Sequence, residues 1–171
     1  MSDVERPGSP GWWVSKARRF RSHVLARVGA AEHAALGAWL SPAQRALFDA
    51  MHVADRRHGL DVVAALRLAG VTEPDALVAG LLHDAGKGNA GVVARIFHSL
   101  EQAYGPLVPA TVRRRPAMAG VLDRLAHHAE RSATLAAGAG CSPRTVDLIR
   151  WQDAPRDPEF GEILRFADEA N

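Results

Sequence analysis

Cysteine is almost missing from this chain of 171 residues, and its scarcity limits both the covalent and the metal chemistry available. Cys141 is the single cysteine, so no disulfide can form within the chain, and a zinc site built from several thiolates is excluded. This usage fits a reducing compartment. Any metal ion must therefore be held by histidine nitrogens and carboxylate oxygens.

Long apolar runs are also lacking. A membrane-spanning helix requires an uninterrupted apolar stretch of about 18 residues, and no such stretch occurs in the sequence. The basic and then apolar pattern of a secretory signal is absent from the opening residues, MSDVERPGSPGWW. These two absences predict a cytoplasmic protein. The formal net charge of +2 is too small to indicate a nucleic-acid partner, because such proteins concentrate Lys and Arg on one face.

Strand patterns are a third absence. Aromatic residues make up only 6% of the chain, and β-branched residues do not alternate with polar ones, whereas apolar residues repeat at helical spacing. A chain of this length can bury about two-thirds of the surface that it exposes when unfolded, and neither a linker nor a repeat divides it. We therefore predict an all-α fold in one compact domain over 1–171, with 1–11 as a flexible lead.

Seven helices are expected, and capping residues mark several of their ends. Ser41 and Ser142 each precede a proline, which combines an N-cap with a favoured first-turn residue, and Gly70 suits a C-cap. Gly59 lies within the apolar stripe of 42–69, and the pattern leaves open whether this segment is one bent helix or two. The expected helices cover about 12–28, 42–69, 74–84, 91–105, 117–138, 143–151 and 160–170.

The first expected helix, over 12–28, has two possible uses. It combines an apolar face with a basic one, as helices that lie on an anionic membrane surface do. Most amphipathic helices in compact domains instead pack their apolar face on the core, and we favour that interpretation. The apolar face includes Trp12 and Trp13, and the basic residues are Lys16, Arg18, Arg19 and Arg21.

The stretch LLHDAGKG, residues 81–88, places two potential metal ligands where a helix is expected to end. Neighbouring side chains inside a helix point about 100° apart, so His83 and Asp84 could not both reach one ion from there. At a helix end, Gly86 and Gly88 give the backbone the freedom to turn Asp84 toward His83. Two ligands hold an ion weakly, so further ligands must come from elsewhere in the chain.

His58 in DRRHGLDVVAAL, the pair in LLHDAGKG and Asp168 in ILRFADEAN supply the same residue types in the same order as a known signature. Together they resemble the H…HD…D signature of HD-domain metal-dependent phosphohydrolases, an all-α family. The resemblance covers most of the chain, from about Leu47 to Asp168. It implies one divalent cation bound by His58, His83, Asp84 and Asp168.

Two imidazoles and two carboxylates suit Mn, Fe, Co, Ni, Zn or Mg, and the ligand types do not choose among these metals. A cation of this kind activates water and polarises a phosphoryl oxygen. The resemblance therefore implies hydrolysis of a phosphate ester or anhydride, in a nucleotide or a related small molecule. Asp84 could also orient the attacking water, and Lys87 could neutralise phosphate charge. A solvated lysine is an equally good interpretation of Lys87.

The segment LAHHAERSATLAAGAG resembles the H-x-x-x-G segment of the family, with His128 in register and His127 beside it. Ser132 stands where relatives carry glycine, and Trp151-Gln152 stands where two-metal relatives carry a histidine pair. Because tryptophan does not bind metals, we predict a single metal ion and a role for His128 as substrate contact, proton donor or support for the ligands. The alternative is a catalytically degenerate HD domain that binds or senses a nucleotide.

Overall fold

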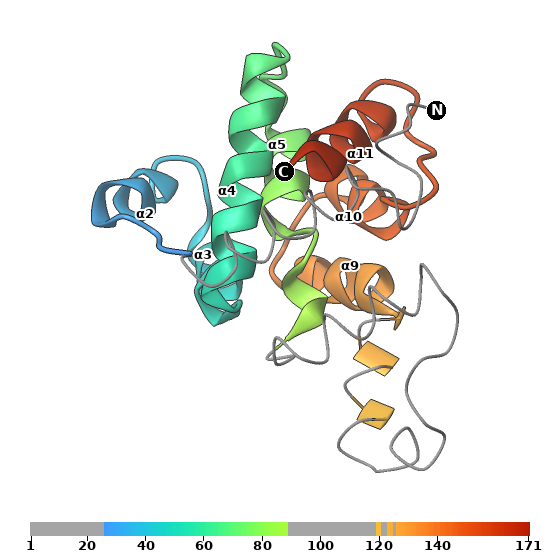
Figure 1. Ribbon diagram of the computed structural model, residues 1–171, viewed down its shortest axis with the longest axis horizontal. Helices are drawn as coiled ribbons and strands as arrows, with labels where there is room; N and C mark the ends of the chain where they lie inside the picture. Colours follow the sequence, from blue (N-terminus) through green and yellow to red (C-terminus); the bar gives the residue numbers. More distant parts are fainter. Residues whose placement is uncertain (1–25, 89–118, 121–122, 125) are drawn as a thin grey trace, which may run out of the picture.

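The computed structural model describes residues 26–88, 119–120, 123–124 and 126–171. Within these ranges the chain is helical and contains no strand (Figure 1), so the predicted all-α class is confirmed. No helix in the described ranges is both long enough and apolar enough to cross a membrane. The described helices are α2 (Ala30–Leu36), α3 (Pro42–Ala50), α4 (Val53–Leu68), α5 (Pro74–Leu82), the 3₁₀ helix η1 (Ala85–Lys87), α9 (His128–Gly138), α10 (Pro143–Arg150) and α11 (Gly161–Ala170).

The N-terminal part of the chain differs from the prediction where it is described. The expected helix over 91–105 and the first part of the helix expected at 12–28 lie outside the described residues. Residues 26–28 are described and are not helical, so the predicted helix end is wrong. Gly29 is extended, its N–H donates to the Glu32 carboxylate at 2.9 Å, and the unpredicted helix α2 follows. This helix has only seven residues and no side-chain N-cap, so its sequence carries little signal.

Two of the long expected helices are interrupted. The segment 42–69 forms two helices, because Met51 and His52 have extended backbone angles, with ψ of 153° and 143°. The His52 imidazole then accepts a backbone N–H from the first turn of α4 at 3.2 Å and begins that helix. In the segment 117–138, His127 leaves the helical conformation, and α9 begins at the next residue.

The predicted caps are confirmed. The Ser41 hydroxyl accepts the N–H of Gln44 at 3.2 Å at the start of α3, and the Ser142 hydroxyl accepts that of Thr145 at 3.1 Å at the start of α10. Gly70, with a φ of 85°, follows the end of α4. These three residues act through local backbone geometry, which is why the sequence predicts them.

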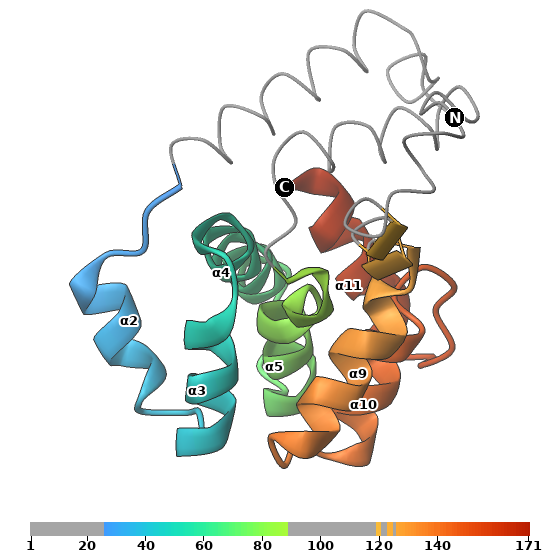
Figure 2. The same cartoon turned by 90° about the horizontal axis from the view of Figure 1, so that it is seen from below.

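Helix α5 lies at the centre of the described fold. Every residue from Ala76 to Leu82 is buried, and the helix packs against α4 on one side and against α10 and α11 on the other (Figure 1). Helix α9 packs along α10 and contacts η1 (Figure 2). A helix that is apolar on all sides must be enclosed by others, so α5 carries His83 and Asp84, which follow it directly, into the interior.

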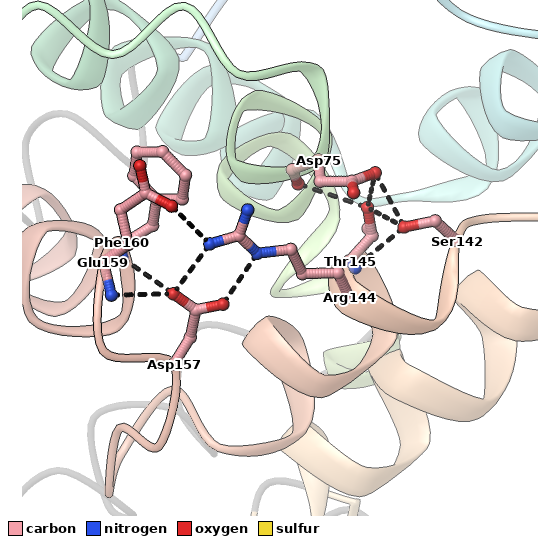
Figure 3. A network of polar contacts seen from close by, with 7 residues as sticks. All are labelled: Asp75, Ser142, Arg144, Thr145, Asp157, Glu159 and Phe160. Atoms are coloured by element: carbon pink, nitrogen blue, oxygen red, sulfur yellow. Dashed lines mark hydrogen bonds and ion pairs between the residues drawn. The ribbon is translucent and has the colours of Figure 1, made fainter.

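A polar network joins α10 to α5 and to the loop before α11 (Figure 3). The hydroxyls of Ser142 and Thr145 donate to Asp75 on α5, at 2.6 and 3.0 Å. From the same turn of α10, the Arg144 guanidinium donates to Asp157 at 2.8 Å, and Asp157 accepts the backbone N–H of Phe160 at 2.9 Å, where α11 begins. This network therefore fixes the start of the helix that carries Asp168.

Candidate metal centre

Helices α4 and α5 cross closely enough to place two histidines side by side. A β-carbon added to Gly59 would lie 2.4 Å from the carbonyl oxygen of Leu81, so only glycine allows this crossing. His58 precedes that glycine, and His83 follows Leu81 by two residues. Their imidazole rings meet edge to face, with centroids 5.2 Å apart and an interplanar angle of 66°. Gly59 is thus explained by packing within a continuous helix rather than by a bend.

Asp168 reaches the same point from α11. Its Oδ1 lies 2.7 Å from His58 Nε2 and 3.4 Å from His83 Nε2. One ligand atom from each of these three residues lies within 4.8 Å of the other two, a spacing that one metal ion could bridge. The described residues therefore contain a possible metal-binding triad of two imidazoles and one carboxylate.

The fourth predicted ligand, Asp84, lies where the helix ends. Helix α5 stops at Leu82, and Asp84 adopts φ −98° and ψ 5°, which brings its Oδ1 to 3.5 Å from His83 Nε2. Gly88 does take a positive φ, of 60°. Gly86 instead lies inside η1, so it does not supply the backbone freedom that the sequence analysis assigned to it. Glycine is required at position 86 because its backbone lies in close contact with α9.

Lys87 and His128 flank Asp84. The Lys87 ammonium donates to Asp84 Oδ2 at 2.6 Å, and His128 Nε2 lies 3.8 Å from Asp84 Oδ1. Lys87 is therefore ion-paired and not a freely solvated side chain. His127 contacts Asp123 on the preceding turn, through Nδ1 at 3.1 Å from a carboxylate oxygen. Of the two adjacent histidines, His128 is the one that faces the cluster.

The structure thus brings all the predicted site residues together. We use the name ligand cluster for the four predicted ligands, which are the triad of His58, His83 and Asp168 together with Asp84, and Lys87 and His128 lie beside it.

Two buried atoms of the ligand cluster have the properties of metal ligands. The Gly80 carbonyl lies 2.9 Å from His83 Nδ1 and accepts its proton, which leaves Nε2 to face the acids. His83 Nε2 and Asp84 Oδ1 find no hydrogen-bond partner among the described residues, although both side chains are only 2% exposed. Buried polar atoms rarely stay unpaired. A divalent cation would satisfy both, so the residues present fit such an ion.

The charges within the cluster support one another. Burial disfavours the His83 imidazolium, but the carboxylates of Asp84 and Asp168 outweigh burial and raise the pKa of His83 to about 9. Burial likewise opposes ionisation of Asp84 and Asp168, yet the neighbouring imidazoles hold the pKa of both carboxyls well below its usual range. The two carboxylates therefore stay ionised and favour a cation, and a proton and a metal ion compete for the same His83 lone pair.

Two further residues lie near the site but belong to none of the sequence motifs described above. Asp55 is 4% exposed and lies one turn before His58 on α4. Burial lowers the pKa of Lys87, but Asp84 and, to a smaller extent, Asp55 outweigh burial and raise it. The sequence could have indicated Asp55 through its spacing, because residues three apart, as Asp55 and His58 are, lie on the same face of a helix. The Arg124 side chain passes over Gly88, with its Nε 3.8 Å from the position that a β-carbon would take.

Trp151 and Gln152 follow α10, at the positions that the sequence resemblance sets against the histidine pair of two-metal HD-domain proteins. The Arg156 guanidinium stacks on the Trp151 ring at 3.3 Å from its centroid. The Gln152 side chain is buried, and its amide makes no hydrogen bond within the described residues. Neither residue belongs to the triad that could hold a metal ion.

Comparison with protein-family models, curated proteins and solved structures finds no significant match to this chain. The interpretation below therefore rests on the residues and their geometry.

Proposed function

We propose that this protein is a metal-dependent phosphohydrolase of the HD-domain type. One divalent cation would be held by His58, His83, Asp84 and Asp168, and the substrate would be a phosphate ester or anhydride in a nucleotide or related small molecule. The observation that carries the proposal is the pair of buried, unbonded ligand atoms, His83 Nε2 and Asp84 Oδ1. They lie beside the contact between His58 and Asp168.

The side chains around the ligand cluster suit phosphoryl chemistry. A bound divalent cation supplies Lewis acidity, which activates water and polarises a phosphoryl oxygen. Oδ1 of Asp84 faces His83, and Oδ2 accepts from Lys87. Asp84 can therefore orient a water molecule while Lys87 balances its charge. Lys87 adds positive charge for a phosphate group. His128, on the other side of Asp84, can move a proton to or from the reacting groups.

A second function, nucleotide binding without turnover, is favoured by one observation. Where two-metal HD-domain proteins carry a histidine pair, this chain has Trp151, which is stacked against Arg156, and Gln152, and neither residue belongs to the triad. In this alternative the ligand cluster holds a metal ion that helps to bind a nucleotide phosphate. The segment 12–28, for which the sequence allows contact with a membrane surface, lies mostly outside the described residues.

Metal content tests the ligand cluster without relying on turnover. The wild-type protein, metal-depleted and titrated with Mn²⁺, should bind one ion, and His83→Ala should lose at least about tenfold in affinity. His33→Ala is the matched control. His33 on α2 also contacts a carboxylate, that of Asp49 on α3, at 2.6 Å, and the pair lies away from the ligand cluster. Equal Mn²⁺ affinity in wild type and His83→Ala would contradict the proposed site.

Turnover separates the two functions. Purified protein with Mn²⁺ or Ni²⁺, offered a panel of nucleotides, should release phosphate or a nucleoside monophosphate, and Asp84→Ala should abolish the release. If wild-type protein binds a nucleotide but neither protein releases product, the binding function replaces the hydrolytic one. If Asp84→Ala turns over at the wild-type rate, the observed activity does not come from this site.

A further inference from the structure

A buried hydrogen bond links the turn that carries Asp84 to α9. The hydroxyl of Ser132 accepts the backbone N–H of Gly86 at 2.8 Å, across 46 positions of sequence. Ser132 is fully buried, with 0% of its surface exposed. The contact therefore joins two backbone segments in the interior, where water does not compete with it.

The two segments pack so closely that no side chain fits between them. A β-carbon added to Gly86 would lie 2.5 Å from the carbonyl oxygen of His128 and 2.6 Å from the backbone nitrogen of Ser132. Helix η1 thus rests directly on the first turn of α9. His128 and Ser132 are four residues apart and lie on one face of that helix.

These contacts set the position of His128 relative to Asp84. Asp84 precedes Gly86 by two residues, and His128 Nε2 lies 3.8 Å from Asp84 Oδ1. A movement of η1 along α9 would change that distance directly. The Ser132 hydroxyl supplies a buried polar contact between η1 and α9 at this point.

We propose that Ser132 is a positioning residue of the site: its hydroxyl holds the Gly86 amide and thereby holds His128 against Asp84. A role in turnover rests on the proposed function, whereas the positioning itself needs neither metal nor substrate. Ser132→Ala removes one oxygen atom and leaves a good helix former in α9. Thr134→Ala is the matched control, because it also removes a hydroxyl from α9, one that is exposed and donates to the Glu130 carbonyl at 2.9 Å.

The first measurement uses metal-free protein and nuclear magnetic resonance. In Ser132→Ala the Gly86 amide should exchange with solvent at least about tenfold faster, relative to the amide of the core residue Val62. The imidazole signals of His128 should shift as well. Neither change is expected in Thr134→Ala. Unchanged His128 signals in Ser132→Ala would overturn the positioning role, whatever the protein does with metals or nucleotides.

The second measurement compares kinetic constants with a nucleotide that the wild type hydrolyses. Ser132→Ala should lower kcat by about 10- to 100-fold, as loss of a residue that orients reacting groups does, and leave KM within about twofold. Wild-type kcat in Ser132→Ala would also overturn the proposal. If the wild type shows no turnover while the resonance changes appear, the hydrolytic function fails and the positioning role stands.

Discussion

Asp168 Oδ1 lies 2.7 Å from His58 Nε2, although 110 positions of sequence separate the two residues. The contact closes the ligand cluster between α11 and α4, and it puts a carboxylate from the last helix beside the buried pair at the end of α5. Any metal bound by His58 and His83 would therefore meet Asp168.

We first predict that Asp168→Asn weakens Mn²⁺ binding by at least about tenfold, because an amide oxygen carries no charge and one ligand is lost. The control is Asp49→Asn, whose carboxylate contacts His33 at 2.6 Å with a nearly equal exposure of 42%, against 41% for Asp168. Calorimetric titration of both variants with Mn²⁺ gives the comparison. Equal losses of affinity would mean that the loss of a surface charge explains the effect.

A second prediction concerns the close crossing of α4 and α5. Gly59→Ala should destabilise the protein by about 1–3 kcal/mol, because its β-carbon would meet the Leu81 carbonyl oxygen at 2.4 Å. Gly138→Ala, within α9, meets no atom within 4 Å and should stabilise the protein by up to about 1 kcal/mol through helix propensity. Urea unfolding measures both changes. A Gly59→Ala variant as stable as wild type would contradict the packing described for Gly59.

The two adjacent histidines give a third prediction. His128→Ala should lower kcat for a hydrolysed nucleotide by at least about 100-fold, because this imidazole faces Asp84 and is positioned for proton transfer. His127→Ala should stay within about twofold of wild type, because that side chain is exposed and contacts Asp123. Steady-state kinetics measures kcat for both variants and for wild type. A larger effect at His127 would reverse the assignment of the two residues.

A fourth prediction concerns pH and the loop before α11. The Arg144 guanidinium lowers the pKa of Asp157 from 3.8 to about 2, with help from the backbone N–H groups of Phe160 and Glu159. A carboxyl with a lowered folded-state pKa stabilises the fold above its unfolded value, and this stabilisation is lost as pH falls through the folded value. Asp157→Asn should therefore be less stable than wild type near neutral pH. The difference should shrink between about pH 4 and pH 2.

Urea unfolding of wild type and Asp157→Asn across that pH range measures the effect. Glu159→Gln is a suitable control, because Glu159 also accepts from Arg144 but lies more exposed, at 62% against 14% for Asp157. A constant difference between wild type and Asp157→Asn from neutral pH to about pH 2 would show that the ion pair is not the cause.

Local signals in the sequence predicted local structure well. Ser41, Ser142 and Gly70 act through bonds within a few residues of themselves, and the structure contains all three caps. The break after α3 depends on extended backbone angles at Met51 and His52. Neither residue is typical of a turn, so the sequence did not predict this break. Helix α2 lacks a side-chain cap and was not predicted.

The site was predictable in its residue types but not in how those residues are held. The order of His58, the His-Asp pair and Asp168 suggested one cluster, and their side chains do lie together. The supports come from tertiary packing, which periodicity does not reveal. They include the place of Gly59 against α5 and the Ser132 bond to Gly86. Gly86 itself was assigned a role in backbone freedom, whereas it provides room for α9.

The ligand cluster has a closed side and an open side. His83 and Asp84 are each 2% exposed, whereas His58 is 23% exposed and Asp168 41%. An ion that enters from solvent would thus meet the carboxylate of Asp168 first, and it would lose its last water molecules only at the buried imidazole of His83. Exchange of the ion would then be governed by Asp168, while the preference for one metal over another would be set by the buried pair, His83 and Asp84.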